Sequence, residues 1–372
     1  MQILIIVNAP PPYGGGEIRG THIARYLSEI EGYVCYCYSR SKASKKSQGR
    51  VTFRNISEGL GWIRQVLRLI RIHDPSKLYL SIPKNTSAFL RLFPVLEYAN
   101  RKGVKVYGEL AGARFLFLDR PGVFRSIALR YLHMFHSIRF LGKHIQDYHK
   151  KYGFSNTVAF DNGIDESDLK DGDYLTRASS RPLRLLYVGV LNRTKGIPKL
   201  IDALLITLKA GVSFTCTFVG EWGDSSLQNE IEQLLAANPS LEQKITFTGR
   251  LDSDAIWEEY KKAAILVHPT EWDGQPLTIL EAYAMGLCVI TTKVGAIPDT
   301  VADIENGRLM DDNEPSGIAE AITWYARNPE SLAEVMGRNR ELFEKRFTLE
   351  RYLSNVEKWL SAETPQQDLF IR

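Results

Sequence analysis

Two carboxylates stand eight positions apart at a predicted loop-to-helix junction, Asp273–Gly286, which has the sequence DGQPLTILEAYAMG. Asp273 precedes the turn, and Glu281 lies one turn into the predicted helix. Gly274 lets a ligand approach the backbone closely, and Pro276 suits the first helical position because its missing N–H group costs nothing there. The free N–H groups of the first helical turn can bind an anion. This layout could hold a sugar hydroxyl, a phosphate and a ribose diol, and the alternative is an ordinary junction with two surface acids.

Two basic side chains follow a predicted strand near the middle of the chain. The segment YVGVLNRTKG contains Gly189, Arg193 and Lys195. Both cations come just after the carboxyl end of the strand, where they would neutralise a diphosphate. Solvated basic residues in a surface loop are the alternative.

Three consecutive glycines, Gly14, Gly15 and Gly16, join the first predicted strand to a helix. Backbone amides in such a turn can cradle a phosphate or pack against a sugar. Together with Gly20 the turn approximates a dinucleotide fingerprint, but the spacing is one residue too long and no acid follows the second strand. A nicotinamide site is therefore disfavoured, and a flexible turn without a ligand remains open.

Other polar groups carry weaker signals. Exposed backbone groups at Arg250 and Leu251, after the predicted strand Ile245–Thr248, could contact a base edge. Asp252 and Asp254 resemble a metal-binding acid pair, but capping of the helix that follows is the favoured interpretation. We expect the histidines to be surface or core residues rather than catalytic ones; among them are His133, His136, His144 and His149.

Composition describes an ordinary globular protein with 44% hydrophobic and 24% charged residues, and no apolar run long enough to span a membrane. The net charge of +4 conceals 26 Lys/Arg against 13 Asp/Glu in residues 1–170, which gives +13 and leaves −9 for the remainder. The basic half favours an anionic lipid surface or a phosphorylated substrate, and no nucleic-acid motif accompanies it. On one helical face lie Arg64, Arg68 and Arg71, which suit a membrane interface or an ordinary surface helix. The cysteines form no disulfide framework, so we expect a cytoplasmic protein, peripheral at the inner face of the membrane if that basic face binds lipid.

Strands and helices alternate along the chain, which predicts an α/β fold with parallel sheets covered by helices on both faces. The first set of predicted strands is Ile3–Val7, Val34–Tyr38, Leu78–Ile82, Val104–Tyr107 and Ile138–Leu141. Helices are predicted between them at Ile18–Ile30, Leu60–Ile72, Thr86–Arg101 and Phe124–Phe135. After a polar stretch, predicted to be a linker, a second alternating set begins at Leu183–Val188. We predict two doubly wound domains, followed by helices at Ser316–Asn328, Pro329–Glu344 and Leu349–Ser361.

Five ordered segments make the chain resemble the retaining glycosyltransferases of family 4 (glycosyl transferases group 1), which have the GT-B fold. The segments are PPYGGGEIRG, FDNGID, YVGVLNRTKG, DGQPLTILEAYAMG with TTKVGAIPDTV, and ENGRLMDDNEPSGIAEAI with NRELFEKRFTLERY. The resemblance implies two Rossmann-like doubly wound domains facing across a cleft. Residues 1–170 would bind the acceptor, residues 171–182 would be a linker, and residues 183–346 would bind a nucleotide sugar. A C-terminal helix at about 347–372 would pack back on the first domain.

The resemblance also implies roles for individual residues. Glu281 would bind the donor ribose, Asp273 the sugar, and Lys195 with Arg193 the diphosphate. The backbone of Gly274, Gln275, Pro276 and Leu277 would hold sugar and phosphate, with Gly189, Arg250 and Leu251 beside the nucleotide and the Gly15–Gly16 turn closing over it. Three positions depart from the family pattern: Asp273 replaces a Glu, Val190 replaces an Arg for which Arg193 would compensate, and Glu109 stands near the place of a His on the acceptor side.

The implied activity is retaining transfer of a hexose-type sugar from a nucleoside-diphosphate sugar to an acceptor hydroxyl, in bacterial cell-surface polysaccharide or glycolipid synthesis. It would need neither cofactor nor metal. A saccharide or lipid-linked acceptor and a peripheral anionic membrane are the expected partners besides the donor. A GT-B nucleotide-sugar epimerase and a non-catalytic sugar-nucleotide-binding protein remain alternatives.

Overall fold

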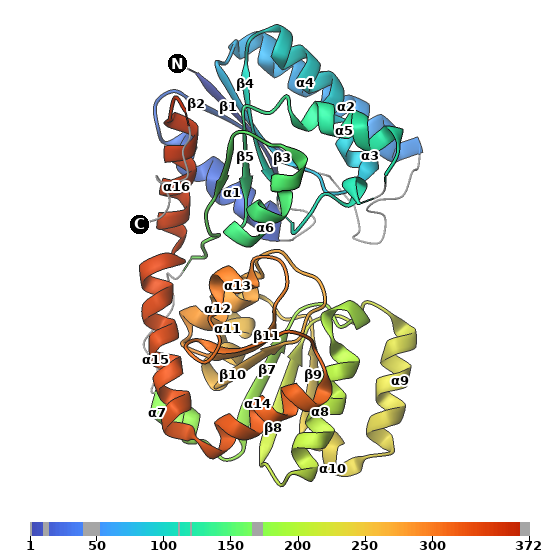
Figure 1. The fold of residues 1–372 in the computed structure, drawn as a ribbon, viewed down its shortest axis with the longest axis vertical. Coiled ribbons are helices and arrows are strands. Elements are labelled where there is room, and N and C mark those ends of the chain that lie inside the picture. The colour runs from blue at the N-terminus through green and yellow to red at the C-terminus, as the bar shows by residue number, and fades with distance from the viewer. Residues whose placement is uncertain are drawn as a thin grey trace. The chain divides into compact units, whose positions relative to one another are not determined.

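The computed structural model describes residues 2–9, 15–39, 53–110, 112–119, 121–165 and 174–364. The chain divides into two compact units, one formed by Met1–Asp161 with Glu350–Arg372 and the other by Asn162–Leu349 (Figure 1). The predicted boundary at residue 170 therefore differs from the structure by nine residues, since 170 − 161 = 9.

The first unit is built on a six-stranded sheet in which every strand pair is parallel, with the order β2-β1-β3-β4-β5-β6. Its strands are β1 (Ile3–Ala9), β2 (Tyr33–Ser39), β3 (Lys77–Ile82), β4 (Lys105–Leu110), β5 (Ser137–Phe140) and β6 (Thr157–Ala159). The apolar run of β1 is buried from Ile3 to Val7, as expected of a strand covered on both faces.

Helices connect these strands (Figure 1). They are α1 (Gly15–Ser28), α2 (Phe53–His73), α3 (Thr86–Phe89), α4 (Leu92–Arg101), α5 (Val123–Leu132) and α6 (Lys143–His149), with short 3₁₀ turns at Leu116–Leu118 and Lys150–Tyr152. Instead of the single predicted helix Thr86–Arg101 there are two, α3 and α4. The ring of Pro94 would clash with the carbonyl group of Leu90, four residues earlier, and the helix is interrupted there.

The helix α16 (Leu349–Ser361) joins the first unit through buried contacts with its sheet. The Trp359 ring is fully buried, lies edge-on to Tyr107 with 5.5 Å between ring centroids, and donates from Nε1 to Ser137 Oγ at 2.9 Å. Lys77 Nζ donates to the last carbonyl groups of the helix, including Leu360 O at 2.6 Å. A cation at the carboxyl end of a helix satisfies carbonyl groups that have no partner within the helix.

The second unit has the strand order β12-β11-β10-β7-β8-β9, again parallel throughout. Its strands are β7 (Leu183–Val188), β8 (Phe214–Val219), β9 (Ile245–Gly249), β10 (Ile265–His268), β11 (Cys288–Thr292) and β12 (Gly307–Met310). In order of appearance this is the arrangement 3-2-1-4-5-6 in reverse, the strand order of a Rossmann fold. The order changes direction between β7 and β10, so their carboxyl ends border the crevice where such sheets bind ligands.

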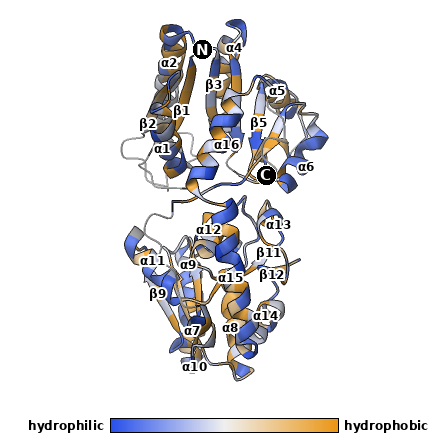
Figure 2. Cartoon of the chain, turned by 90° about the vertical axis from the view of Figure 1, so that its left-hand side faces the viewer, coloured by the Kyte–Doolittle hydropathy of each residue, from blue (hydrophilic) through white to orange (hydrophobic). Residues whose placement is uncertain are grey.

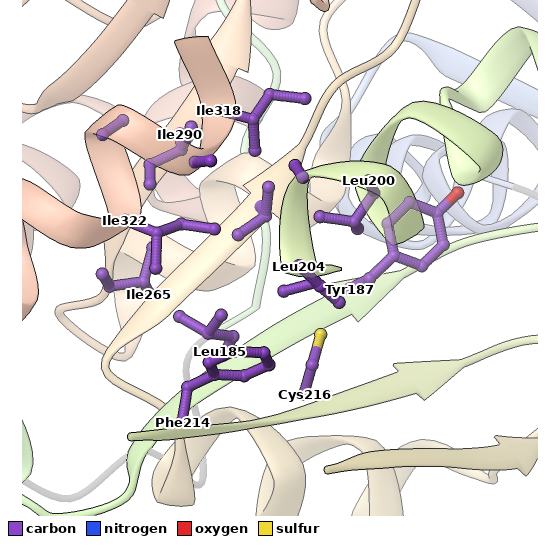
Figure 3. Packing of buried hydrophobic residues seen from close by; sticks show 14 of the residues in the cluster. Leu185, Tyr187, Leu200, Leu204, Phe214, Cys216, Ile265, Ile290, Ile318 and Ile322 are labelled. Atoms are coloured by element: carbon purple, nitrogen blue, oxygen red, sulfur yellow. The ribbon is translucent and has the colours of Figure 1, made fainter. Parts of the chain in front are cut away.

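Helices cover both faces of this second sheet. They are α7 (Tyr174–Ser179), α8 (Ile197–Lys209), α9 (Ser225–Ala236), α10 (Pro239–Glu242), α11 (Ser253–Lys262), α12 (Leu277–Ala284), α13 (Ile297–Thr300), α14 (Pro315–Arg327) and α15 (Pro329–Arg346), with a 3₁₀ turn at Arg193–Lys195. Leu185 and Tyr187 point into one apolar cluster, which Figure 3 shows with Leu200 and Leu204 of α8. The intervening residue Leu186 belongs to the cluster on the opposite face. In Figure 2 the strands of both sheets are largely hydrophobic, whereas helices carry hydrophilic outer faces.

Part of the predicted linker 171–182 is helical, because Tyr174–Ser179 forms α7 in the second unit. Arg177 fixes this helix by donating to the carbonyl groups of Ala263 and Met285, at the carboxyl ends of α11 and α12. The helix was not predicted because its sequence is polar and the residues that anchor it lie far away in the chain. Also missed were the short elements β6, α6, α10, α13 and β12.

The overall prediction of parallel, doubly wound α/β sheets is confirmed. Among the described residues, no helix combines the length and the apolar composition needed to cross a membrane.

Candidate active site

The two loops that follow β7 and β10 bring Lys195 and Asp273 together at the change in strand order of the second sheet. Lys195 ends the 3₁₀ turn after β7, and Asn192 caps that turn by accepting from the Lys195 N–H at 2.9 Å. Lys195 Nζ forms an ion pair with Asp273 Oδ2, and Asp273 Oδ1 accepts from the Gly274 N–H at 2.9 Å. The structure therefore unites one predicted cation and one predicted acid in a single pair.

His268, the last residue of β10, completes this group. Its side chain is 3% exposed, and Nε2 lies 3.4 Å from Asp273 Oδ2. Burial by itself would raise the pKa of the Asp273 carboxyl, but His268 and Lys195 outweigh burial and hold that pKa well below its usual range. Asp273 is therefore ionised at neutral pH. We did not predict a role for His268, and only its position at the end of a strand beside the acidic loop could have indicated one.

Two glycines allow the loops to come this close. At Gly196, whose φ is +76°, an added Cβ would lie 2.0 Å from the Pro269 carbonyl oxygen. At Gly295, whose φ is +58°, it would lie 2.2 Å from the Asp273 carbonyl oxygen. The neighbouring Ala296 N–H donates to Gly274 O at 2.8 Å. The backbone beside Asp273 is thus held from both sides by segments that tolerate no side chain at the contact.

Glu281 lies on α12 and is partly buried. Its Oε2 atom accepts from the hydroxyl group of Tyr260, a fully buried residue of α11, at 2.7 Å. Burial raises the pKa of the Glu281 carboxyl, although the hydrogen bond from Tyr260 opposes that rise. Tyr260 is a second residue that could not be selected from the sequence, because its hydroxyl reaches Glu281 only through the packing of α11 against α12.

The segment between the two acids places Pro276 just before α12 rather than in its first position. Pro276 is the residue before the helix, with φ −64° and ψ 126°, and Leu277 is its first residue. Gly274 and Gln275 are buried. Gln275 Oε1 accepts from the Asn162 N–H at 2.7 Å, and its Nε2 donates to Thr300 Oγ1 at 3.1 Å. The Gln275 side chain is therefore committed to protein contacts, whereas the first-turn N–H groups of α12 point beyond the start of the helix.

Other predicted donor contacts lie at neighbouring strand ends. Arg193 is about half exposed and forms an ion pair with Glu230 of α9 instead of joining Lys195. Gly189 follows β7 with φ +147°. Arg250 is exposed after β9, next to the partly buried Leu251. Asp252 caps α11, as predicted, by accepting from the Ala255 N–H at 3.0 Å.

Three predicted residues belong to the first unit. Gly15 and Gly16 begin α1 rather than lying in a turn before it, and Gly14 falls outside the described residues. Glu109 is 1% exposed on β4 and forms ion pairs with Arg19 at 2.7 Å and Arg139 at 3.1 Å.

Further contacts enclose the Glu109 carboxylate. The hydroxyl group of Tyr79 also donates to it, at 2.8 Å. The Glu109 carboxylate is thus buried among protein partners, and its predicted place on the acceptor side stays a prediction.

The site contains the Lys195 ammonium group, the ionised Asp273 carboxylate and a helix start, which suit a diphosphate and sugar hydroxyls. The described residues include no group of three or more His, Cys, Asp or Glu side chains that could hold a metal ion.

Residues 176–342 match the family model described as glycosyl transferases group 1. Over 205 residues, or 55% of this chain and 53% of the relative, the sequence is 28% identical to the glycosyltransferase MJ1178 of Methanocaldococcus jannaschii. The chain is also 31% identical over 164 residues to the capsular polysaccharide biosynthesis glycosyltransferase CapM of Staphylococcus aureus. This match covers 44% of this chain and 41% of the relative. The matches thus span about half the length of these relatives or less.

The fold has close structural counterparts. HepE of Anabaena, solved in complex with UDP, has a TM-score of 0.74 at 17% identity, covering 97% of this chain and 100% of that chain. Its complex with UDP-glucose has a TM-score of 0.72. The two sheets of the chain are those of the GT-B fold, and residues 176–342 are similar in sequence to the glycosyl transferases group 1 family.

Proposed function

We propose that this protein transfers a hexose-type sugar from a nucleoside-diphosphate sugar to an acceptor hydroxyl, with retention of configuration. The observation that carries the proposal is the Lys195–Asp273 pair at the β7/β10 crevice, with Glu281 on the helix that follows. Relatives named as glycosyltransferases, one of them in capsular polysaccharide synthesis, support the same reaction class.

The chemistry assigns a separate task to each group. As the bond between the sugar and the diphosphate breaks, negative charge grows on the phosphate oxygens. Lys195 and the amino end of α12 would stabilise that charge without a metal ion or cofactor. A phosphate oxygen of the leaving group would accept the proton of the acceptor hydroxyl on the same face of the sugar. Asp273 would bind sugar hydroxyls, and Glu281 would accept hydrogen bonds from the ribose diol.

We propose a lipid-linked saccharide as the acceptor, at the inner face of a bacterial membrane. Arg64, Arg68 and Arg71 are exposed along α2, and Ile72 beside them is 59% exposed. A cationic face with an exposed apolar residue suits an anionic bilayer. Vesicle sedimentation with and without anionic lipid tests this part, with an Arg64→Gln/Arg68→Gln/Arg71→Gln variant as the comparison. Failure of wild-type protein to bind anionic vesicles at low salt would remove it.

The donor site is tested first with UDP-, GDP- and ADP-sugars, using the rise in melting temperature to select the base and product analysis to detect transfer. Glu281 is then tested with the selected nucleoside diphosphate and its 2′-deoxy analogue. Wild-type protein should prefer the ribose form, and Glu281→Ala should lose that preference. Sugar transfer to an acceptor supports the proposal, whereas turnover without acceptor indicates an epimerase. Donor binding with no turnover indicates a non-catalytic protein.

A further inference from the structure

His268 is a buried polar residue whose two ring nitrogens form no hydrogen bond of ordinary geometry. The residue is 2% exposed, and neither Nδ1 nor Nε2 has a hydrogen-bond partner within the described parts of the chain. Nε2 nevertheless lies 3.4 Å from Asp273 Oδ2, just beyond the usual hydrogen-bond distance. Burying an imidazole without hydrogen bonds costs folding free energy, and an apolar side chain would fill the same space without that cost.

The surroundings hold the ring in one orientation. The Tyr187 ring stacks on it with 6.3 Å between centroids and 15° between planes. Thr291 Oγ1 donates to the His268 carbonyl oxygen at 2.8 Å, which fixes the backbone. The charged groups that face the imidazole are the Asp273 carboxylate and, across that carboxylate, the Lys195 ammonium group. The ring therefore presents one nitrogen to Asp273.

Donor binding would change the partners of Asp273. In the structure Lys195 Nζ contacts Asp273 and the Trp272 carbonyl oxygen. A donor diphosphate carries more charge than one carboxylate and would draw the ammonium group to itself. Asp273 would then retain the Gly274 N–H, which contacts Oδ1, and its Oδ2 atom would face His268.

We propose that His268 is a positioning residue, which donates from Nε2 to Asp273 and keeps the carboxylate directed at the donor sugar when Lys195 turns to the diphosphate. This rests on the proposed function, because it assumes a nucleoside-diphosphate sugar at this site. The proposal assigns the two parts of the donor to different residues. Binding of the diphosphate depends on Lys195, and binding of the sugar depends on Asp273, which His268 holds in place.

The test compares UDP with UDP-glucose by isothermal titration calorimetry, or the corresponding pair of whichever base the wild-type protein selects. His268→Leu should weaken binding of the nucleotide sugar about tenfold or more, because a hydrogen bond to a charged group is lost. Binding of the nucleoside diphosphate should change less than about threefold, since the diphosphate does not contact Asp273. His268→Gln should restore part of the sugar-dependent affinity, because its amide nitrogen can replace Nε2 as a donor.

Thr207→Val is the control, because it removes a buried hydrogen bond to the Ala203 carbonyl oxygen within α8 of the same unit and involves neither His268 nor Asp273. Its affinities for the two ligands should fall together or stay unchanged. Equal losses for both ligands in His268→Leu, or no loss, would overturn the positioning role. A wild-type protein that binds no nucleotide of the panel would instead overturn the proposed function itself.

Discussion

Replacing Lys195 with methionine and Asp273 with asparagine, singly and together, measures the coupling at the centre of the site in the ligand-free protein. Two unit charges 4 Å apart interact by about 4 kcal/mol at an effective dielectric constant of 20. The side chains are only 24% and 22% exposed, so desolvation and side-chain ordering offset much of that attraction. We expect a coupling free energy of about 1–3 kcal/mol between the two positions.

The assay is chemical denaturation of the wild type, both single variants and the double variant at pH 7. Each single variant should be destabilised, since it leaves an unpaired charge. The double variant should lose less stability than the sum of the two single losses. The contribution of Asp273 also depends on pH. Its folded pKa is lowered, so the stabilisation is present above its unfolded pKa of about 3.9 and is lost as pH falls below that value. Additive free energies with no coupling would refute the account of this pair.

Two further predictions concern other parts of the chain. Burial lowers the pKa of His149 to about 4 from its ordinary 6.5. The unfolded state therefore takes up the proton first, and the His149 contribution, which is present above about pH 6.5, falls by about 2 kcal/mol by pH 5. His149→Phe should flatten that part of the pH dependence in denaturation curves, and an unchanged slope would contradict the assignment. Gly196→Ala should lower the free energy of unfolding of the second unit by much more than Gly211→Ala does. Both glycines have φ +76°, but of these two only Gly196 would place a Cβ against a carbonyl oxygen. Equal unfolding free energies for the two alanine variants would show that the contact with Pro269 is relaxed at little cost.

Most of the fold was predictable because buried parallel strands and amphipathic helices leave strong patterns. The runs Ile3–Val7 and Leu183–Val188 are nearly continuous apolar segments, and both form strands. One error has a local cause and the other a long-range cause. Pro94 interrupts a helix that periodicity alone predicts as continuous, and α7 depends on Arg177 contacts with residues distant in sequence.

The candidate site was predictable only in part. Lys195 and Asp273 could be selected because each follows a strand and carries a charge, and the parallel sheet brings such loops together. His268, which faces Asp273, and Tyr260, which donates to Glu281, were not selected, since a histidine in a strand and a tyrosine in a helix are usually core residues. The two arginines that pair with Glu109 could not be identified from the sequence either, because both lie far from it in the chain.

The most direct test of the account is a structure of the protein with the nucleotide sugar that the panel selects. We predict the diphosphate within hydrogen-bonding distance of Lys195 Nζ, at the β7/β10 crevice, and the ribose hydroxyls donating to the Glu281 carboxylate. A donor bound elsewhere, or a bound donor whose ribose leaves Glu281 paired only with Tyr260, would contradict the central claim.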